Sequence, residues 1–370
     1  MGFQCGIVGL PNVGKSTIFN ALTAGSGAHA EAANYPFCTI QPNTGIVKVP
    51  DPRLKKIAEF IPPQVLIPAV MTFVDIAGLV KGASKGEGLG NQFLGHIRDT
   101  NAIAHVTRCF ENDNIVHVDG SVNPERDISV IDTELIFSDL DAINKKFKGL
   151  ENLTKTGDKK AAAVLGVLQR VRASLEKGQP ARALKLDKDE MALIYEYHLI
   201  TIKPVLYVAN MDENGILDPS KNKFYQAVKK IADAEGSQIV AICGAIEAEI
   251  AEMPNADERA EFLRELGMSE TGLDRVIRAG YDLLGFSTYF TAGEKEVRAW
   301  TIKRGDKAPA AAGVIHTDFE KGFIRAEVYH YDDLVACKTE KAVKDKGLMR
   351  LEGKEYTVKD GDIMHFLFNV

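Results

Sequence analysis

Short apolar runs alternate along the first two thirds of the chain with stretches that have helical spacing. The apolar runs cover residues 3–10, 70–76, 102–109, 203–210 and 238–243. Each is short enough for a buried strand and is bounded by turn residues. Helical spacing occurs at 15–23, where Ile18 and Leu22 share one face, and again at 223–234. Strands that alternate with helices predict an α/β fold with a mostly parallel sheet and helices on both faces.

A long polar insertion separates the third and fourth of these strands and covers residues 129–199. Apolar residues recur in its first part at helical spacing, and a second helical run covers 161–175. The polar segment 154–160 lies between the two runs, so the insertion predicts two antiparallel helices that form a coiled-coil arm. The surrounding residues, 1–128 and 200–284, are then the two parts of one α/β domain.

The pattern changes again near residue 285, where alternating apolar and polar positions predict short strands. These strands are expected at 297–302, 322–331, 354–358 and 363–368. Residues 285–370 are therefore expected to form a separate, small α+β domain.

The composition is that of a protein with a sizeable core, since 45% of the 370 residues are hydrophobic and 26% are charged. The net charge of -6 excludes a global basic field for nucleic acid, so any such contact needs a local patch. The five cysteines are scattered without zinc-ligand spacing, which indicates reduced thiols and a cytoplasmic location. The sequence lacks a signal peptide and any run long enough to span a bilayer, so no membrane partner is expected.

Residues 9–17, Gly-Leu-Pro-Asn-Val-Gly-Lys-Ser-Thr, match the phosphate-binding pattern G-x-x-x-x-G-K-[ST]. The match follows a strand and precedes a helix, so a chance match in a glycine-rich turn is a poor explanation. Backbone N–H groups can surround phosphate oxygens there, Lys15 can reach the β- and γ-phosphates, and Ser16 can hold Mg²⁺. The residues expected to contact the nucleotide here are Asn12, Val13, Gly14, Lys15, Ser16 and Thr17.

A second motif, Asp75-Ile76-Ala77-Gly78, stands at the carboxyl end of the strand at 70–76. Alone this pattern is usually a turn, but with a P-loop upstream it predicts that Asp75 holds Mg²⁺ directly or through water. The N–H of Gly78 can touch the γ-phosphate, which gives Gly78 a catalytic, hydrolysis-sensing role. Thr39, in the polar loop after the first helix, is expected to close over Mg²⁺ as a switch threonine.

Together with other short motifs, these residues resemble the Obg-related GTPases and, among them, the YchF subfamily. The further motifs are the glycine-rich run 81–90, Phe-Glu-Asn-Asp-Asn at 110–114, Asn-Met-Asp-Glu at 210–213 and the terminal Phe-Leu-Phe-Asn-Val. The resemblance covers nearly the whole chain and implies a P-loop NTPase domain, an inserted helical arm and a C-terminal TGS domain. It also implies an ATPase that associates with the ribosome, with the large subunit as the expected partner.

The motif at 210–213 bears on which base is bound, because GTPases usually carry Asn-Lys-x-Asp there. Met211 stands at the position of the lysine that packs along the base. Glu213 stands at the position of the aspartate, and its longer side chain overshoots the guanine edge. A lost bidentate contact costs a few kcal/mol in rough terms, so ATP is expected to be preferred over GTP, with Asn210 or nearby backbone groups meeting adenine. The alternative that Asp212 restores guanine recognition stays open.

Catalysis needs a group that orients water, and Leu79 cannot supply it at the position where Ras-like enzymes carry glutamine. His117 is the candidate in its place, because histidine handles protons near neutral pH. An ordinary surface-loop role for His117 is an equal alternative. Asn12 is a weaker candidate for binding a monovalent cation such as K⁺.

Two basic patches fall on the predicted arm, one at 145–148 and one formed by Lys159, Lys160, Arg170 and Arg172. They could touch RNA phosphates, although a solvated helix face explains each patch taken singly. The resemblance to TGS modules implies a further RNA or ribosome contact. Three functions therefore stay open: a slow ATPase switch on the ribosome, an adaptor that hydrolyses ATP only incidentally, and a true GTPase. The sequence leaves the oligomeric state undetermined.

Overall fold

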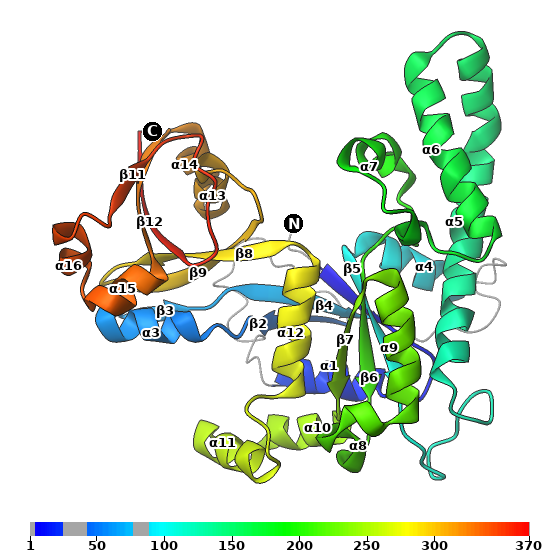
Figure 1. The fold of residues 1–370 in the computed structure, drawn as a ribbon, viewed down its shortest axis with the longest axis horizontal. Helices are drawn as coiled ribbons and strands as arrows, with labels where there is room; N and C mark the ends of the chain where they lie inside the picture. Colours follow the sequence, from blue (N-terminus) through cyan, green and yellow to red (C-terminus); the bar gives the residue numbers. More distant parts are fainter. Residues whose placement is uncertain (1–3, 25–42, 77–88, 370) are drawn as a thin grey trace. The chain divides into compact units, whose positions relative to one another are not determined.

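A computed structural model describes residues 4–24, 43–76 and 89–369. The chain divides into two compact units (Figure 1). The first unit comprises Met1–Ile46 and Thr72–Gly280, and the second comprises Val47–Met71 and Tyr281–Val370.

The first unit is built on a six-stranded sheet with the order β2-β4-β1-β5-β6-β7. Its strands are β1 (Gln4–Val8), β2 (Thr44–Lys48), β4 (Val70–Asp75), β5 (Ala102–Arg108), β6 (Val205–Asn210) and β7 (Gln238–Ile242). β1 pairs in parallel with β4 and β5, and β6 pairs in parallel with β5 and β7. Every residue of β5 and β6 is buried, as strands covered on both faces require. The predicted α/β fold with a mostly parallel sheet is confirmed, and β2 is an additional strand.

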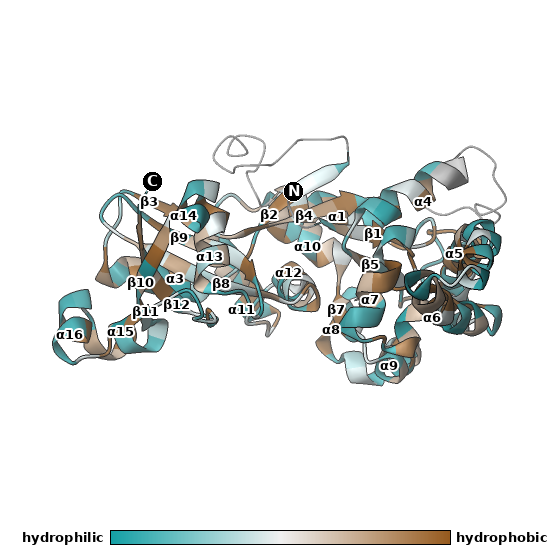
Figure 2. Ribbon diagram, turned by 90° about the horizontal axis from the view of Figure 1, so that it is seen from above, coloured by the Kyte–Doolittle hydropathy of each residue, from teal (hydrophilic) through white to brown (hydrophobic). Residues whose placement is uncertain are grey.

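Helices cover this sheet on both faces. On one face α1 (Lys15–Ala24) packs against α10 (Gly244–Glu252), and on the other α4 (Leu89–Asp99) and α9 (Lys223–Glu235) pack on the strands. In Figure 2 many strand segments have hydrophobic colours and the helices have mixed colours, which is the pattern of a buried sheet covered by amphipathic helices. The remaining elements of this part are α8 (Glu213–Leu217), η5 (Pro219–Lys221), α11 (Ala256–Glu265) and α12 (Gly272–Leu283).

The arm consists of two long helices that lie side by side, α5 (Pro124–Lys155) and α6 (Lys159–Glu176) (Figure 1). Their facing apolar residues form a cluster of their own, with Ile143 and Leu168 fully buried. The first helix begins before the predicted insertion at 129, because Asn123 caps it and accepts a hydrogen bond from the N–H of Arg126. The arm ends in η3 (Ala181–Leu184), α7 (Lys188–Ile194) and η4 (Tyr195–Tyr197).

The second unit has its own six-stranded sheet, with the order β11-β10-β12-β8-β9-β3. Its strands are β3 (Val65–Ile67), β8 (Phe286–Ala292), β9 (Glu296–Lys303), β10 (Phe323–His330), β11 (Arg350–Glu352) and β12 (Asp362–Phe368). Its helices are α3 (Pro52–Phe60), α13 (Ala308–Ile315), α14 (Thr317–Lys321), α15 (Tyr331–Cys337) and α16 (Glu340–Asp345). Tyr289, Trp300, Val328 and Met364 are among the residues of its core.

Two features of the second unit differ from the sequence-based expectation. Residues 47–71 belong to it, whereas the predicted boundaries placed them within 1–128, and the reason is that β3 pairs in parallel with β9. The predicted strand at 354–358 is wrong, since that segment contributes only an isolated bridge between Thr357 and Lys307. The outer domain limits and the TGS assignment stay predictions.

No helix among the described residues combines the length and the apolar character that crossing a membrane requires. Four cysteines of this part, Cys5, Cys109, Cys243 and Cys337, are free thiols. Burial raises the pKa of the Cys5 thiol to about 12, so this sulfur is an inert core group.

Candidate functional site

The sequence motifs meet at one edge of the first sheet. β1, β4, β5, β6 and β7 are linked by parallel pairing, so their carboxyl ends lie along the same edge. The P-loop follows β1, Asp75 ends β4, and Asn210 ends β6. Ligands of open parallel sheets bind at this edge, because the loops that follow the strands converge there.

A pocket of ≈ 540 Å³ opens at this edge. Its size suits a small-molecule ligand of nucleotide dimensions. The residues that line it are Asn12, Gly14, Thr17, Phe110, Glu111, Asn112, Ile115, Asn210, Met211, Asp212, Glu213, Asn214, Cys243, Gly244 and Ala245. The wall therefore combines P-loop residues with the loops that follow β5, β6 and β7. Val13, Lys15 and Ser16 belong to the same P-loop but do not line this part of the pocket.

The backbone of the P-loop depends on residues that tolerate a left-handed conformation. Asn12 has φ 61° and Gly14 has φ 99°. A Cβ at Gly14 would lie 2.2 Å from Nδ2 of Asn210, so only glycine fits. The P-loop can approach the loop after β6 this closely only because position 14 has no side chain.

Lys15 is a buried cation at the start of α1. Its Nζ donates a hydrogen bond to the carbonyl oxygen of Leu10 at 2.7 Å, within the P-loop itself. Burial lowers the pKa of Lys15 to about 8, while the carboxylate of Asp75 acts in the opposite direction. The ammonium group therefore stands desolvated at the phosphate end of the loop, where an anionic ligand would stabilise it.

Asp75 has a carboxylate oxygen that fits a metal-binding role. Its Oδ1 is buried and has no hydrogen-bond partner among the described residues. Burial raises the pKa of this carboxyl group, and Lys15 opposes the shift. An unsatisfied, half-buried carboxylate oxygen beside a P-loop is a donor that Mg²⁺ prefers, and Ser16 is exposed at the same loop. Thr39 and Gly78, the other predicted site residues here, lie outside the described residues.

Asn210 serves the site differently from the sequence-based expectation. Its Nδ2 donates to the carbonyl oxygen of Val13 at 2.9 Å, and its Oδ1 accepts from the N–H of Gly244 at 3.0 Å. The side chain therefore ties the P-loop to the loop after β7, and its contact with adenine stays a prediction. The sequence alone could not assign these partners, because both are main-chain groups in distant loops.

The other residues of the base motif occupy distinct environments. Met211 is buried in the pocket wall, whereas Glu213 is exposed at the start of α8. Asp212 is the N-cap of that helix, and its Oδ1 accepts from the N–H of Gly215 at 2.8 Å. This bond uses one oxygen of the carboxylate that the alternative interpretation assigns to guanine.

The loop after β5 lines the pocket, which sequence reasoning missed. Phe110, Glu111, Asn112 and Ile115 all contribute to the wall. Their segment was visible only as a motif shared with the resembling family. Its position after a fully buried strand of the parallel sheet was the available signal, because such loops gather at the ligand-binding edge.

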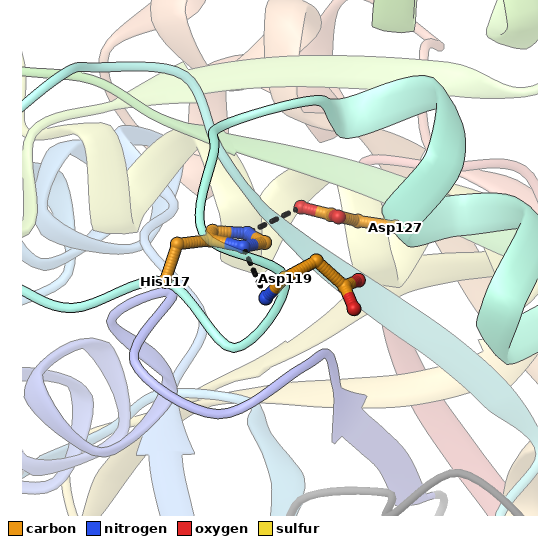
Figure 3. Close-up of side chains that lie close together, drawn as sticks. All are labelled: His117, Asp119 and Asp127. Atoms are coloured by element: carbon orange, nitrogen blue, oxygen red, sulfur yellow. Dashed lines mark hydrogen bonds and ion pairs between the residues drawn. The ribbon is translucent and has the colours of Figure 1, made fainter.

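His117 is buried and pairs with Asp127 at the start of α5 (Figure 3). Its Nε2 lies 2.9 Å from Oδ2 of Asp127, and its Nδ1 accepts from the N–H of Asp119 at 3.2 Å. These partners assign the neutral tautomer with the proton on Nε2. An exposed surface-loop role is therefore wrong. His117 does not line the pocket, and its catalytic role stays a prediction.

The three side chains His117, Asp119 and Asp127 could in principle offer ligand atoms to one metal ion. Arg126, however, pairs with both carboxylates, at 3.3 Å from Asp119 and 3.4 Å from Asp127. The guanidinium group already supplies the positive charge, so this cluster is better described as an ion-pair network at the base of the arm.

Comparison with known proteins places the chain in a family. A family model described as a 50S ribosome-binding GTPase matches residues 4–136, and the model YchF-GTPase_C, described as a protein of unknown function, matches 286–369. The chain is 57% identical over 370 residues, the full length of both proteins, to the ribosome-binding ATPase YchF of Pasteurella multocida. The chain belongs to the YchF family. The resemblance drawn from the motifs is thereby confirmed.

Other members of the YchF family extend this relationship. The ribosome-binding ATPase YchF of Bacillus subtilis is 51% identical over 370 residues, again the full length of both chains. The solved structure of the Schizosaccharomyces pombe YchF GTPase matches with a TM-score of 0.87 and 40% identity, covering 99% of this chain and 98% of that chain. This match includes the residues of both units.

Proposed function

We propose that this protein is a slow nucleoside triphosphatase that prefers ATP, uses Mg²⁺ and associates with the ribosome. One observation carries the enzymatic part of the proposal. The pocket wall unites the phosphate-binding loop, through Gly14 and Thr17, with the loops after β5, β6 and β7. A triphosphate at the first and a purine at the others would occupy the pocket along its length.

The preference for ATP rests on the chemistry of three neighbouring positions. Asp212 caps α8 through Oδ1, Glu213 is exposed with a side chain longer than aspartate, and Met211 replaces the lysine that packs along the base. A site without a bidentate acceptor leaves the guanine N–H groups unpaired, which penalises GTP. The name GTPase carried by the fission yeast protein and by both family models favours the competing assignment.

A competition experiment decides between these two nucleotides. ATP and GTP are titrated against a fluorescent ATP analogue on the purified protein. A tenfold preference for ATP, about 1.4 kcal/mol, supports the proposal, and a tenfold preference for GTP overturns it. The double variant Met211→Lys, Glu213→Asp restores the guanine-reading pattern and is expected to gain GTP affinity, whereas Lys15→Ala is expected to lose both nucleotides.

The proposed metal ligands are Ser16, Thr39 and Asp75. The buried Oδ1 of Asp75, which has no hydrogen-bond partner among the described residues, supports this set. Bound Mg²⁺ would neutralise charge on the β- and γ-phosphates. Asn12 is proposed to take part in binding K⁺. Its Nδ2 donates to the carbonyl oxygen of Val116 at 3.1 Å, which holds the P-loop against the loop after β5.

His117 is the proposed proton-handling residue. The bond from Nε2 to Asp127 orients the ring and fixes the tautomer, so Nδ1 carries the lone pair that a base needs. Since Nδ1 accepts only a 3.2 Å bond from the N–H of Asp119, a modest loop movement would release it. Gly78 is proposed to sense the γ-phosphate.

The proposed partner is the ribosome, with its large subunit and RNA contacted through the arm and the C-terminal unit. The names of the relatives and the description of the matching family model support the partner. On the arm, Lys145 pairs with Asp141 and Arg172 with Glu176, and these local pairs weaken the basic patches. ATP turnover measured with and without ribosomes tests this part, since stimulation is expected and indifference would contradict it. A cytoplasmic location follows from the same proposal.

A further inference from the structure

Arg108 is a fully buried charged side chain at the end of β5, with a relative exposure of 1%. Its guanidinium group donates to three main-chain carbonyl oxygens of the loop that follows. The distances are 3.1 Å from Nε to Phe110, 3.0 Å from Nη2 to Asn112 and 2.9 Å from Nη1 to Ile115. The guanidinium carbon also lies 4.8 Å from the centroid of the Phe110 ring.

The burial of this charge needs an explanation, because removing a cation from water is costly unless it is paired. Among the residues that the structure describes, no carboxylate forms an ion pair with Arg108. The three carbonyl oxygens supply its hydrogen-bond acceptors and match the planar fork that distinguishes arginine from lysine, and the negative charge of Asp127 also favours the charged guanidinium. An apolar residue at this position would remove a donor from each of the three carbonyls, although that of Asn112 also accepts from the N–H of Ile115 at 3.1 Å.

The same three residues whose carbonyls Arg108 holds also line the nucleotide pocket. Together with Glu111, they form the wall contributed by the loop after β5. Their carbonyls face Arg108, and the same residues line the pocket. The conformation of this wall is therefore set from behind by one side chain that does not itself line the pocket.

Two further bonds connect the loop to its surroundings. Asn222 donates through Nδ2 to the carbonyl oxygen of Cys109 at 2.9 Å, and Asn12 of the P-loop donates to that of Val116. These bonds hold the two ends of the loop. Arg108 holds its middle, which is the part that faces the pocket.

We propose that Arg108 is a positioning residue for the base of the bound nucleotide, acting through the wall formed by Phe110, Asn112 and Ile115. This inference rests on the proposed function of the pocket. If the loop loosens, contacts to the base weaken, while contacts from the P-loop to the triphosphate persist. The signature is a loss of affinity for ATP that inorganic triphosphate does not share.

The test compares Arg108→Lys with the unchanged protein and with Arg259→Lys. Arg259 is a matched control, because its guanidinium also holds a loop carbonyl, that of Met253 at 2.8 Å, but away from the pocket. Binding of Mg²⁺-ATP and of Mg²⁺ with inorganic triphosphate is measured by calorimetry, and the melting temperature is recorded. Arg108→Lys is expected to bind ATP about tenfold more weakly with triphosphate affinity unchanged, and Arg259→Lys to alter neither.

Equal losses for ATP and inorganic triphosphate, or no loss of ATP affinity, would overturn the inference. If Arg108→Lys does not fold, Phe110→Leu decides in its place, because it removes the stacked ring and keeps the backbone. The same selective loss of ATP affinity is expected, and an unchanged affinity rejects the proposal. Failure of the proposed function is a different result: the unchanged protein would then bind neither ATP nor inorganic triphosphate.

Discussion

The side chain of Asn210 donates a hydrogen bond to the main chain of Val13, joining the end of β6 to the middle of the P-loop at 2.9 Å. The same amide accepts from Gly244, so three loops of the pocket share one side chain. The absence of a Cβ at Gly14 makes this approach possible. The loops proposed to contact the base are therefore hydrogen-bonded, through Asn210, to the loop proposed to contact the phosphates.

Replacement of Asn210 by aspartate tests this connection. The new oxygen would face the Val13 carbonyl oxygen without a proton to share, and the added charge would lie near the triphosphate. We expect ATP affinity to fall at least about tenfold, measured by calorimetry. Asn20→Asp is the control, because it makes the same change on an exposed position of α1. An unaltered affinity in Asn210→Asp would show that the bond to Val13 is dispensable.

Asp75→Asn tests the proposed metal ligand. An amide is a poorer Mg²⁺ ligand than a carboxylate, so the Mg²⁺ concentration for half-maximal ATP turnover is expected to rise at least about tenfold. Removal of Mg²⁺ with a chelator is expected to abolish turnover of the unchanged protein. Asp233→Asn, which removes an exposed charge paired with Lys229 on α9, serves as the control. Equal Mg²⁺ requirements in both variants would exclude Asp75 from the metal site.

His117→Ala and Asp127→Asn separate the catalytic from the structural role of this pair. If His117 handles a proton, its removal is expected to lower turnover by about 10²-fold or more while ATP binding persists. Asp127→Asn keeps an oxygen that can accept from the Nε2–H group of His117, so it is expected to lower turnover less than His117→Ala does. Turnover and thermal stability are measured for both variants. Parallel losses of stability and turnover would indicate that the pair only secures the start of α5.

The sequence predicted the first unit well because its signals are local. The P-loop pattern, the buried strands and the helical spacing each depend on neighbouring residues, and the parallel sheet follows from the alternation of strands and helices. The addition of β3 to the second sheet was not predictable, since pairing between Val65 and Glu296 joins segments that are remote in sequence. The segment 354–358 alternates like a strand, yet alternation alone does not provide a partner strand.

The site shows the same division between local and distant information. Lys15 and Asp75 were identified from motifs, because short sequence patterns define the positions of these phosphate-binding and metal-binding residues. The role of Asn210 as a bridge, and that of Arg108 behind the pocket wall, depend on main-chain carbonyls whose positions only the fold defines. Buried polar side chains that bind backbone are therefore the class of residue that sequence reasoning misses here.

The attachment of the arm provides a prediction about stability. Asp139 of α5 is fully buried and accepts from the N–H groups of Ile200 and Thr201, at 2.9 and 2.8 Å, and from the Thr201 hydroxyl at 2.6 Å. Asp139→Ala leaves these donors unsatisfied and is expected to lower the free energy of unfolding by about 3 kcal/mol. Asp141→Ala removes only an exposed pair with Lys145, worth about 1 kcal/mol at most. Urea denaturation followed by circular dichroism compares them, and equal effects would contradict the assignment.

His105, in the middle of β5, is expected to make the protein sensitive to acid. The ring is 3% exposed and stacks on Tyr207 with 5.7 Å between centroids. Burial lowers the pKa of His105 from 6.5 to about 3, and the positive charge of Arg182 adds to the shift. Between these two pH values the unfolded chain binds a proton that the folded chain does not. The folded state is therefore expected to lose about 1.4 kcal/mol of stability for each pH unit below 6.5 from this group alone.

The variant His105→Phe isolates that contribution, because it keeps an aromatic ring against Tyr207 and removes the titrating nitrogen atoms. Urea denaturation at several pH values between 7 and 4 is expected to show a stability that falls less steeply with acid than in the unchanged protein. His96→Phe, at an exposed position on α4, is the control and is expected to leave the slope unaltered. Identical slopes in His105→Phe and the unchanged protein would mean that His105 is protonated in the fold, against the cost that burial in β5 imposes on a charged ring.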